Sequence, residues 1–371
     1  MGHNKGKQTD LVADVGQLLT MGFEGTEMSS QLSSMISRLQ PGGIILFARN
    51  IVSARQTYEL LKACQQQVRQ PLFRCVDMEG GVVDRLKKAI APTPSAAGVF
   101  ATGDAKLYHK HGRLIGEECR IAGFNVDFAP VSDLAFETSR SVMGSRAVSA
   151  DSEKVISYVR EFLRGLNSAG VLGCGKHFPG LGEGNLDSHH QLPVIEKPWD
   201  RLWEEDMVPY RRLRREFPMV LVSHAAYPTV TEDKTPASLS VKWITEVLRK
   251  TIGYRGIVVS DDLEMGGVLA AAPIEQASIA TIRAGADIFL ICRKEEYVIR
   301  SFEAVLVEAE RDRRFAARVR ESAKRIGLFK RSHRIGLRQV APTSKAVDRL
   351  ARRLWEFSEE IRLQTIAQEP A

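Results

Sequence analysis

Short, continuously apolar runs alternate along this chain with longer segments whose apolar residues recur at helical spacing. A strand that is buried on both faces needs an unbroken apolar run, whereas a strand with one wet face alternates between apolar and polar residues. The alternation of such strands with helices is typical of a parallel α/β protein. Eight runs fit a buried parallel strand: Gly16–Phe23, Gly42–Phe47, Leu72–Asp77, Phe124–Ala129, Val171–His177, Met219–His224, Gly256–Ser260 and Asp287–Cys292.

The segments between these runs contain recognisable signals for the start and end of helices. One helix is predicted to begin near Asp151 and to end at Gly170, a residue suited to a left-handed cap. A second is predicted to begin after Ser240, a favourable N-cap, and to end at Gly253. A third is predicted over Pro273–Gly285, directly before the last apolar run. Each helix therefore leads into the next strand, as βαβ units require.

Eight repeats of strand and helix predict a closed, TIM-like (β/α)8 barrel of the α/β class. An open doubly wound sheet is the alternative, but no GxGxxG or GxxxxGK[ST] motif follows the first run. No linker marks a second domain. We predict that residues 1–340 form a single catalytic barrel and that residues 341–371 form a C-terminal helical extension packed on it, with an amphipathic helix over Val347–Ile366.

The chain has 371 residues and a formal net charge of +7, with 44% hydrophobic and 26% charged residues, which is ordinary globular usage. Much of the positive excess lies in residues 311–338, where apolar residues recur at helical spacing and aromatic residues do not interleave with the basic ones. We interpret this stretch as helical, with a solvated basic face. We therefore expect no nucleic-acid partner, although a polyanionic substrate remains compatible.

The five cysteines are scattered and show no CxxC spacing, which argues against a disulfide framework and fits a reducing compartment. Met1–Asp10 is polar and has no apolar segment of the kind found in a signal peptide. The longest apolar runs are much shorter than the ~20 residues of a membrane span. We expect a soluble, cytoplasmic protein without a membrane span, and a monomer is favoured.

Charged residues follow nearly every predicted strand. In a barrel, the carboxyl ends of the strands meet at one face, and active sites lie there. Several charges on one face need a ligand to offset the cost of removing them from water. Asp262 is expected to cap the helix that follows, which leaves Asp261 as a nucleophile or metal ligand. The charged residues at these ends include Asp77, Arg85, Arg146, Lys176, His177, His224, Asp261 and Asp262.

The long segment Phe178–Pro193 follows the fifth predicted strand and contains three glycines at alternate positions. Asp187 and His189 are two residues apart, so in extended backbone their side chains lie on the same side. A carboxylate that orients an imidazole gives a general acid/base near neutral pH. The alternative is a hydrogen bond that only fixes the conformation of the loop.

Several segments, taken in order, also match a known family. Lys176–Gly182, followed four residues later by Asp187–His189, resembles the signature of the β-N-acetylglucosaminidase branch of glycoside hydrolase family 3. Met78 stands where this family usually has Gln, and Leu181 stands where many members have His. The pair at 183–184 is Glu-Gly instead of the more usual Asp-Thr. Further matching segments, within a likeness that spans residues 15–325, are Gly42–Asn50, Val76–Arg85, Phe128–Asp133, Gly144–Arg146 and Val259–Met265.

This resemblance implies a retaining glycoside hydrolase that removes non-reducing terminal β-linked N-acetylglucosamine and needs no metal or organic cofactor. Its usual substrates would be 1,6-anhydromuropeptides in peptidoglycan recycling. By the same resemblance Asp261 is the nucleophile, and His189 is the general acid/base with Asp187 as its partner. The residues implied in holding the sugar are Asp77, Arg85, Arg146, Lys176 and His177.

Three alternatives remain. A family 3 enzyme of other specificity, such as a β-glucosidase, usually carries a second domain and lacks the Asp187–His189 segment; phosphorolysis in place of hydrolysis stays open. A catalytically inactive sugar-binding protein is expected to lose Asp261 or His189. A metal-dependent barrel hydrolase usually has a histidine pair after its first strand, where this chain has Thr20–Phe23. Its candidate ligands would be His177, His189, His190, His224 and Asp261.

Overall fold

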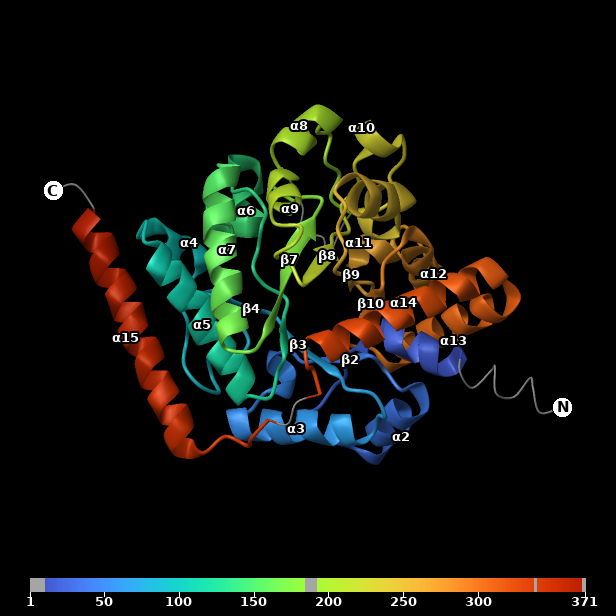
Figure 1. Ribbon diagram of the computed structural model, residues 1–371, viewed down its shortest axis with the longest axis horizontal. Helices are drawn as coiled ribbons and strands as arrows, with labels where there is room; N and C mark the ends of the chain where they lie inside the picture. The colour runs from blue at the N-terminus through green and yellow to red at the C-terminus, as the bar shows by residue number, and fades with distance from the viewer. Residues whose placement is uncertain (1–10, 184–191, 337–338, 369–371) are drawn as a thin grey trace.

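The computed structural model describes residues 11–183, 192–336 and 339–368. Within them, parallel strands close into a barrel with the order β1-β10-β9-β8-β7-β6-β3-β2 (Figure 1). The predicted α/β barrel is therefore confirmed. A separate antiparallel hairpin follows β3 and consists of β4 (Met78–Gly80) and β5 (Val83–Asp84). The barrel strands are β1 (Leu19–Met21), β2 (Gly43–Ile45), β3 (Phe73–Val76), β6 (Val126–Asp127), β7 (Leu172–Phe178), β8 (Met219–Val222), β9 (Ile257–Asp262) and β10 (Ile288–Ile291).

All eight predicted runs contain a barrel strand, but their ends differ from the prediction. Residues 16–18 close a helix instead of opening β1. The predicted end of the seventh run at Ser260 is wrong, because β9 continues to Asp262, which pairs with Leu290 of β10. Asp261 therefore lies inside β9, next to a residue that is paired with β10, and this pairing fixes its backbone.

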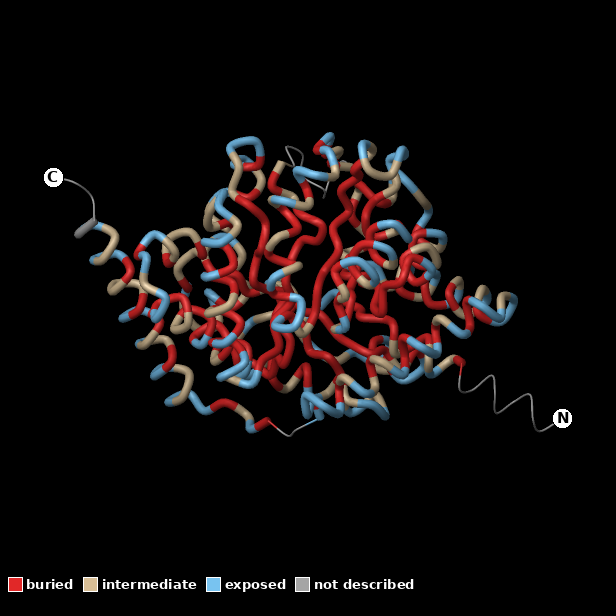
Figure 2. The backbone as a smooth tube through the Cα atoms, turned by 45° about the horizontal axis from the view of Figure 1, so that its top comes forward, coloured by how far each residue is buried: buried red, intermediate tan, exposed pale blue. Residues whose placement is uncertain are grey.

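The strands are buried along their whole length except at the end of β9 (Figure 2). Their outer faces pack against the ring of helices, and their inner faces fill the barrel. This burial on both sides explains why the strands read as unbroken apolar runs. Large side chains that are fully buried in the core include Phe23, Phe73, Phe124, Phe128, Phe162, Phe178 and Phe289.

The helices surround this barrel. Residues 11–18 are helical, and further helices of varied length follow them along the chain. They are α2 (Ser30–Leu39), α3 (Ala54–Gln66), α4 (Ala96–Ala101), α5 (Ala105–Ile121), α6 (Arg140–Met143), α7 (Ser152–Ser168), α8 (Trp199–Glu204), α9 (Val208–Arg212), α10 (Pro228–Thr231), α11 (Gly266–Leu269), α12 (Ile274–Ala284), α13 (Glu295–Arg311), α14 (Arg313–Ser332) and α15 (Ser344–Gln368). Four short 3-10 helices are η1 (Ala48–Asn50), η2 (Glu137–Ser139), η3 (Gly144–Arg146) and η4 (Ala237–Leu239) among the described residues, and η5 (Lys242–Thr251) is a π-helix.

Helix α7 follows its predicted course. The Asp151 side chain accepts hydrogen bonds from the backbone N–H groups of Glu153 and Lys154, and Gly170 ends the helix region with a φ of 76°. The helix packs closely on α5 because glycines face the contact: a Cβ at Gly112 would lie 2.1 Å from the Phe162 carbonyl oxygen. Close backbone approach of this kind fixes the two helices against one another.

The other two predicted helices are present, with one correction. Helix α12 ends at Gly285, whose φ is 115°, as its sequence predicts. The expected capping of η5 by the Ser240 side chain is wrong, because no side chain caps that helix. Ser240 instead closes the preceding turn: its N–H donates to the Ala237 carbonyl, and its own carbonyl accepts from Ile244.

Helix α15 forms as predicted and runs along α4 and α5 on the outside of the barrel (Figure 1). Its buried face includes Leu354 and Phe357. Arg353 pairs with Glu117 of α5, and the Lys110 Nζ lies 5.2 Å from the centre of the Phe357 ring. In the described ranges, no helix is long and apolar enough to cross a membrane.

Candidate active site

A buried glutamate, Glu79, lies at the centre of the charges that follow the strands. It belongs to the hairpin after β3, and its side chain is 3% exposed. The Lys176 Nζ, from β7, lies 2.6 Å from the Glu79 Oε1. The Arg146 Nε and Nη2 donate to both carboxylate oxygens of Glu79, at 2.7 and 2.9 Å. One carboxylate therefore holds two cations from separate parts of the chain.

The charges in this cluster stabilise one another. Burial alone would raise the pKa of Glu79, but Lys176 and Arg146 outweigh it and hold that pKa well below its usual range. Burial likewise would lower the pKa of Lys176, yet Asp77 and Glu79 keep it above its usual range. Removing one member would leave a buried charge without its partner, which is far more costly than losing an exposed ion pair.

Asp77 lies between this buried cluster and the open end of the barrel. Its Oδ1 accepts from the Lys176 Nζ at 3.0 Å, and its Oδ2 lies 3.9 Å from the Arg85 Nη2. The side chains of Asp77 and Arg85 are 18% and 30% exposed, so both keep surface for a ligand. The Arg85 guanidinium also lies 5.7 Å from the centre of the Phe47 ring. Asp77 and Arg85 thus offer acceptors and donors at the mouth of the cluster.

A second acid, Asp133, orients His177. The His177 Nδ1 and the Asp133 Oδ2 are 2.6 Å apart, and the His177 backbone N–H donates to the same carboxylate. The Leu181 N–H donates to the Asp133 Oδ1 at 2.8 Å. Because Asp133 is fully buried, these bonds fix both the imidazole and the start of the segment after β7.

Asp261 is partly buried at the end of β9. Burial raises the pKa of its carboxyl, but His224, His177, the Asp262 N–H and Lys176 outweigh burial and hold the pKa below its usual range. His224 is itself fixed, because its Nε2 lies 2.8 Å from the Asp262 carbonyl oxygen and its Nδ1 lies 2.7 Å from the Ser238 Oγ. The site therefore keeps Asp261 ionised.

The neighbouring Asp262 has the opposite behaviour. Burial, together with Glu264, raises the pKa of its carboxyl to about 7. The expectation that Asp262 caps a helix is wrong: its Oδ1 accepts from the backbone N–H groups of Glu264 and Cys292, and the next helix, α11, has no side-chain cap. Asp262 instead ties the end of β9 to the end of β10. Two adjacent carboxyls with separated pKa values are suited to different tasks.

Residues 10–327 match the model of the glycosyl hydrolase family 3 N-terminal domain. The chain belongs to this family. The resemblance seen in the sequence motifs is thereby confirmed.

Similarity to individual proteins and solved structures supports the membership in family 3. A protein named beta-hexosaminidase from Alkalilimnicola ehrlichii is 37% identical over 287 residues, which are 76% of this chain and 82% of that protein. A family 3 beta-N-acetylglucosaminidase from Paenibacillus sp. str. FPU-7 has a similar structure, with a TM-score of 0.88 and 32% identity over 94% of this chain and 68% of that one. For a beta-N-acetylhexosaminidase from Beutenbergia cavernae the values are 0.78 and 25%, over 88% and 98%. This family 3 chain is thus a glycosidase of the β-hexosaminidase branch.

The predicted site residues of this family 3 chain fall into two groups. Asp187 and His189 lie outside the described residues. The others gather around the carboxyl ends of β3, β7 and β9: Asp77, Arg85, Arg146, Lys176, His177 and Asp261. Sequence reasoning gave no role to Glu79 or Asp133. The spacing Asp77-Met78-Glu79 was the available signal, because residues two apart on a strand share one side.

The segment before residue 184 is anchored by a buried lysine. The Lys197 Nζ lies 2.6 Å from the Asp206 Oδ2 and 3.3 Å from the Glu183 Oε1. Glu183 stands where the family usually has Asp, so this chain keeps a carboxylate in the anchor, on a longer side chain. A Cβ at Gly180 would lie 2.5 Å from the Asp206 Cβ, which explains the glycine there. The start of the segment is therefore held against α8 and α9.

Among the residues that the structure describes, no group of three or more His, Cys, Asp or Glu side chains is arranged to hold a metal ion.

Proposed function

We propose that this family 3 chain is a retaining β-N-acetylglucosaminidase, with Asp261 as the nucleophile and His189, paired with Asp187, as the general acid/base. The observation that supports this best is the state of Asp261. It is a carboxylate at the end of a paired strand, and its surroundings lower its pKa while those of its neighbour Asp262 raise the pKa to about 7. A nucleophile must be charged, held in position and accessible, and Asp261 meets each condition.

The reaction then has two steps. The Asp261 carboxylate attacks the anomeric carbon, the glycosidic bond breaks, and His189 gives its proton to the leaving oxygen. The neutral imidazole next takes a proton from water, whose oxygen attacks the anomeric carbon and releases Asp261. The products are free N-acetylglucosamine with retained β configuration and the aglycone released in the first step.

The sugar is held by the charged groups around Asp77. Asp77 and Arg85 offer partly exposed acceptors and donors, and Lys176 lies behind them. Arg146 and His177 are each fixed by a buried carboxylate, so they can present hydrogen-bonding groups in one orientation. A polar site that is built in advance discriminates against sugars that lack the matching hydroxyl groups, because its own groups would stay unpaired.

We propose 1,6-anhydromuropeptides as the natural substrate class and the cytoplasm as the place of action. The support is the signature of Lys176–Gly182 with Asp187–His189, together with the state of the cysteines. All five cysteines are free and buried, as expected for a reducing compartment.

The test is an assay of purified protein on p-nitrophenyl β-N-acetylglucosaminide. Asp261→Ala should lose about 10³-fold or more in kcat, and His189→Ala should lose less, because this leaving group hardly needs a proton. Asp348→Ala, an exposed acid on α15, is the control and should act as wild type. EDTA should have no effect, and added phosphate should leave N-acetylglucosamine as the product.

A second arm uses natural substrates. The wild type should release N-acetylglucosamine from a 1,6-anhydromuropeptide with a higher kcat/KM than from chitobiose. Cleavage of the corresponding glucoside with no cleavage of the N-acetylglucosaminide would contradict the proposed specificity. Full activity of Asp261→Ala would contradict the proposed nucleophile.

A further inference from the structure

A groove opens at the amino ends of the barrel strands, opposite the candidate active site. Its cavity is about 920 Å³. It is bounded by Leu172, the first residue of β7, and by Pro218 and Gly256, which directly precede β8 and β9. Buried apolar side chains such as Phe217 form part of its lining. This volume lies within the roughly 300–1,000 Å³ that is usual for small-molecule sites.

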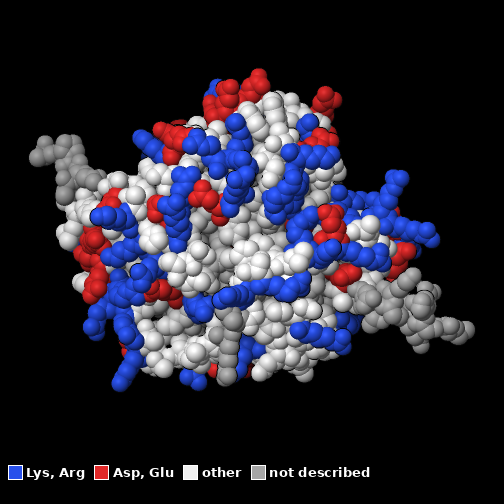
Figure 3. All heavy atoms as spheres, in the orientation of Figure 1, with Lys and Arg blue, Asp and Glu red and all other residues white. Residues whose placement is uncertain are grey.

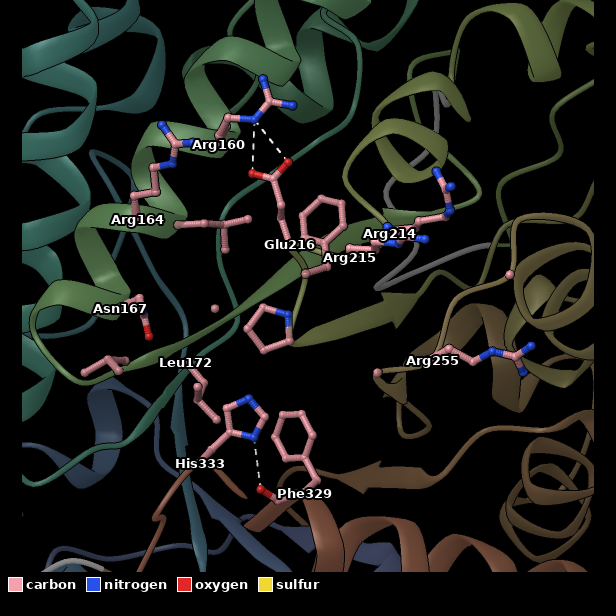
Figure 4. A pocket seen from close by; sticks show the side chains of 17 residues that line it. Arg160, Arg164, Asn167, Leu172, Arg214, Arg215, Glu216, Arg255, Phe329 and His333 are labelled. Carbon is pink, nitrogen blue, oxygen red and sulfur yellow. Dashed lines mark hydrogen bonds and ion pairs between the residues drawn. The ribbon is translucent and has the colours of Figure 1, made fainter. Parts of the chain in front are cut away.

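The charge of this groove is unbalanced. Figure 4 shows Arg160 and Arg164 on one side, on α7, and three more arginines on the other side. Among the described lining residues the only carboxylate is Glu216, and the Arg160 Nε already donates to it, at 3.0 and 3.1 Å. Arg164 pairs with Glu161, which lies outside the lining, at 2.6 Å. The arginines on the other side are Arg214, Arg215 and Arg255. Figure 3 looks onto this face, and basic side chains surround its central hollow.

A second cavity, of about 490 Å³, adjoins the groove. The two share Asn167, Leu172 and His333 in their linings. The second cavity adds three arginines and no carboxylate: Arg74, Arg120 and Arg334. In the described residues, no carboxylate lies within ion-pair distance of any of these three. The connected cavities therefore form one basic site.

Arg74 shows most clearly that this basic site lacks a negatively charged partner. The residue is 8% exposed, and its Nε is buried without a hydrogen bond. Burial, and then the neighbouring Arg120, lower the pKa of the guanidinium to about 10. At neutral pH it is still charged. A buried charge is normally paired, and two adjacent guanidinium groups repel each other unless an anion lies between them.

The chemistry of the lining indicates which anion fits. Guanidinium groups form paired, parallel hydrogen bonds to phosphate and carboxylate oxygens, and they do so better than lysine. The positively charged side chains of the lining are arginines, and they extend from Arg74 to Arg255 across both cavities. A single anion would meet only part of them. The ring of His333, stacked on Phe329 with centroids 4.0 Å apart, adds a flat surface between the two cavities.

We propose that this groove binds a small molecule with two or more phosphate groups, one of them held by Arg74 and Arg120. The site lies at the end of the barrel away from Asp261, so it goes beyond the glycosidase function and does not depend on it. Inorganic tripolyphosphate and a nucleoside triphosphate carry the same chain of phosphate groups. Comparing the two probes shows whether the site recognises an inorganic polyphosphate or a nucleotide.

The experiment is isothermal titration calorimetry on the full chain at about 0.15 M salt, the physiological ionic strength. Wild type should bind tripolyphosphate or a nucleoside triphosphate with a Kd below about 1 mM. Arg120 is an exposed residue. The substitution Arg120→Gln should weaken binding about tenfold, which corresponds to the loss of one charged hydrogen bond. Arg320→Gln, an exposed residue on α14 outside the groove, should bind as wild type.

A second variant tests Arg74 without relying on binding alone. Arg74→Met removes a buried charge without a partner, so it should raise the Tm of the ligand-free protein and also abolish the ligand-induced rise in Tm. Glycosidase activity should stay unchanged in both variants, because neither residue belongs to the candidate active site.

The outcomes separate cleanly. Equal affinity for the two probes supports a site that recognises phosphate groups only, and tighter binding of the nucleotide supports additional recognition of the ring. Absence of binding to both probes, or unchanged binding in Arg120→Gln, would overturn the proposal. Binding of long oligonucleotides without binding of either probe would also overturn it, because the groove would then be a nucleic-acid surface.

Discussion

Arginine and lysine side chains gather at both ends of this barrel, but the cluster around Glu79 and the cavity around Arg74 differ in whether the cations are paired with carboxylates. At the carboxyl ends of the strands, Lys176 and Arg146 share the carboxylate of Glu79. At the amino ends, Arg74 and Arg120 line a cavity in which no carboxylate occurs among the described lining residues. The first arrangement is complete without a ligand and holds its groups in fixed positions. The second is incomplete until an anion arrives.

This difference shows why charge count alone says little about function. A net charge of +7 suggests only a basic surface. The structure separates cations that neutralise buried acids from cations that have no acid beside them. The paired set is suited to holding polar groups in fixed positions, whereas the unpaired set is suited to binding negative charge.

The largest effect is expected from breaking the paired end at Glu79. Glu79→Gln keeps the shape of the side chain but leaves Arg146 without its carboxylate and Lys176 with Asp77 alone. Breaking one partner of a buried pair costs about 3–5 kcal/mol, and both cations should move from their positions. We expect kcat/KM to fall about 100-fold, with a lower Tm, measured by steady-state kinetics and calorimetry.

Glu137→Gln is the matched control for that substitution. Glu137 pairs with Arg140 at the surface, where both side chains are more than three-quarters exposed, at 82% and 76%. Exposed pairs contribute little, so this variant should be indistinguishable from wild type. Equal activity of Glu79→Gln and Glu137→Gln would show that the buried cluster does not position the site.

A smaller effect is expected from Lys330, at the unpaired end. Its Nζ donates to the Gln17 Oε1 at 3.0 Å and to the Gly42 carbonyl at 2.8 Å. Burial lowers its pKa to about 7 from an ordinary value of 10.5. Between these pH values the unfolded state binds more protons than the folded state, so the free energy of unfolding rises with pH. Lys330→Met should remove this rise, measured as Tm from pH 7 to pH 10. Parallel curves for the two proteins would contradict this.

The smallest effect is expected from Asp262, at the paired end, and it has the opposite sign. Burial and Glu264 raise its pKa from 3.8 to about 7. Between these values the folded state binds more protons, so the free energy of unfolding falls as pH rises. Asp262→Asn keeps an oxygen for the N–H groups of Glu264 and Cys292 and should flatten this fall. The readout is Tm from pH 4.5 to pH 7.5, where a gain of a few degrees is expected at the upper end. A variant that falls as steeply as wild type would show that another group titrates.

The sequence was sufficient for the barrel because periodicity reports burial directly. Each of the eight apolar runs contains a strand, since strands covered on both faces require apolar residues at every position. The ends of strands were harder to predict from the sequence. Strand β9 reaches Asp262 because β10 pairs with it, and this pairing is a long-range contact. Ser240 likewise has good capping chemistry but is already engaged in the turn before the helix.

The positions of Asp77, Lys176 and Asp261 at the carboxyl ends of strands were predictable from the sequence, because each directly follows or ends an apolar run, whereas their roles stay predictions. Glu79 was missed because its partner Arg146 is 67 residues away in the chain. The same limit applies to Asp133, which is 44 residues from His177. The groove at the amino ends could not be predicted either, because the arginines of the connected cavities come from α5, α7, β3, the segments before β8 and β9 and the segment after α14.

The role of Asp261 as the nucleophile is tested most directly by trapping the covalent intermediate. The protein is incubated with a fluorinated N-acetylglucosaminyl fluoride, which forms the glycosyl-enzyme faster than it is hydrolysed, and is then digested and analysed by mass spectrometry. We predict one added sugar on the peptide that contains Asp261, and none in Asp261→Ala. An adduct on a different residue, or steady turnover of the reagent with no adduct at any time, would contradict this role.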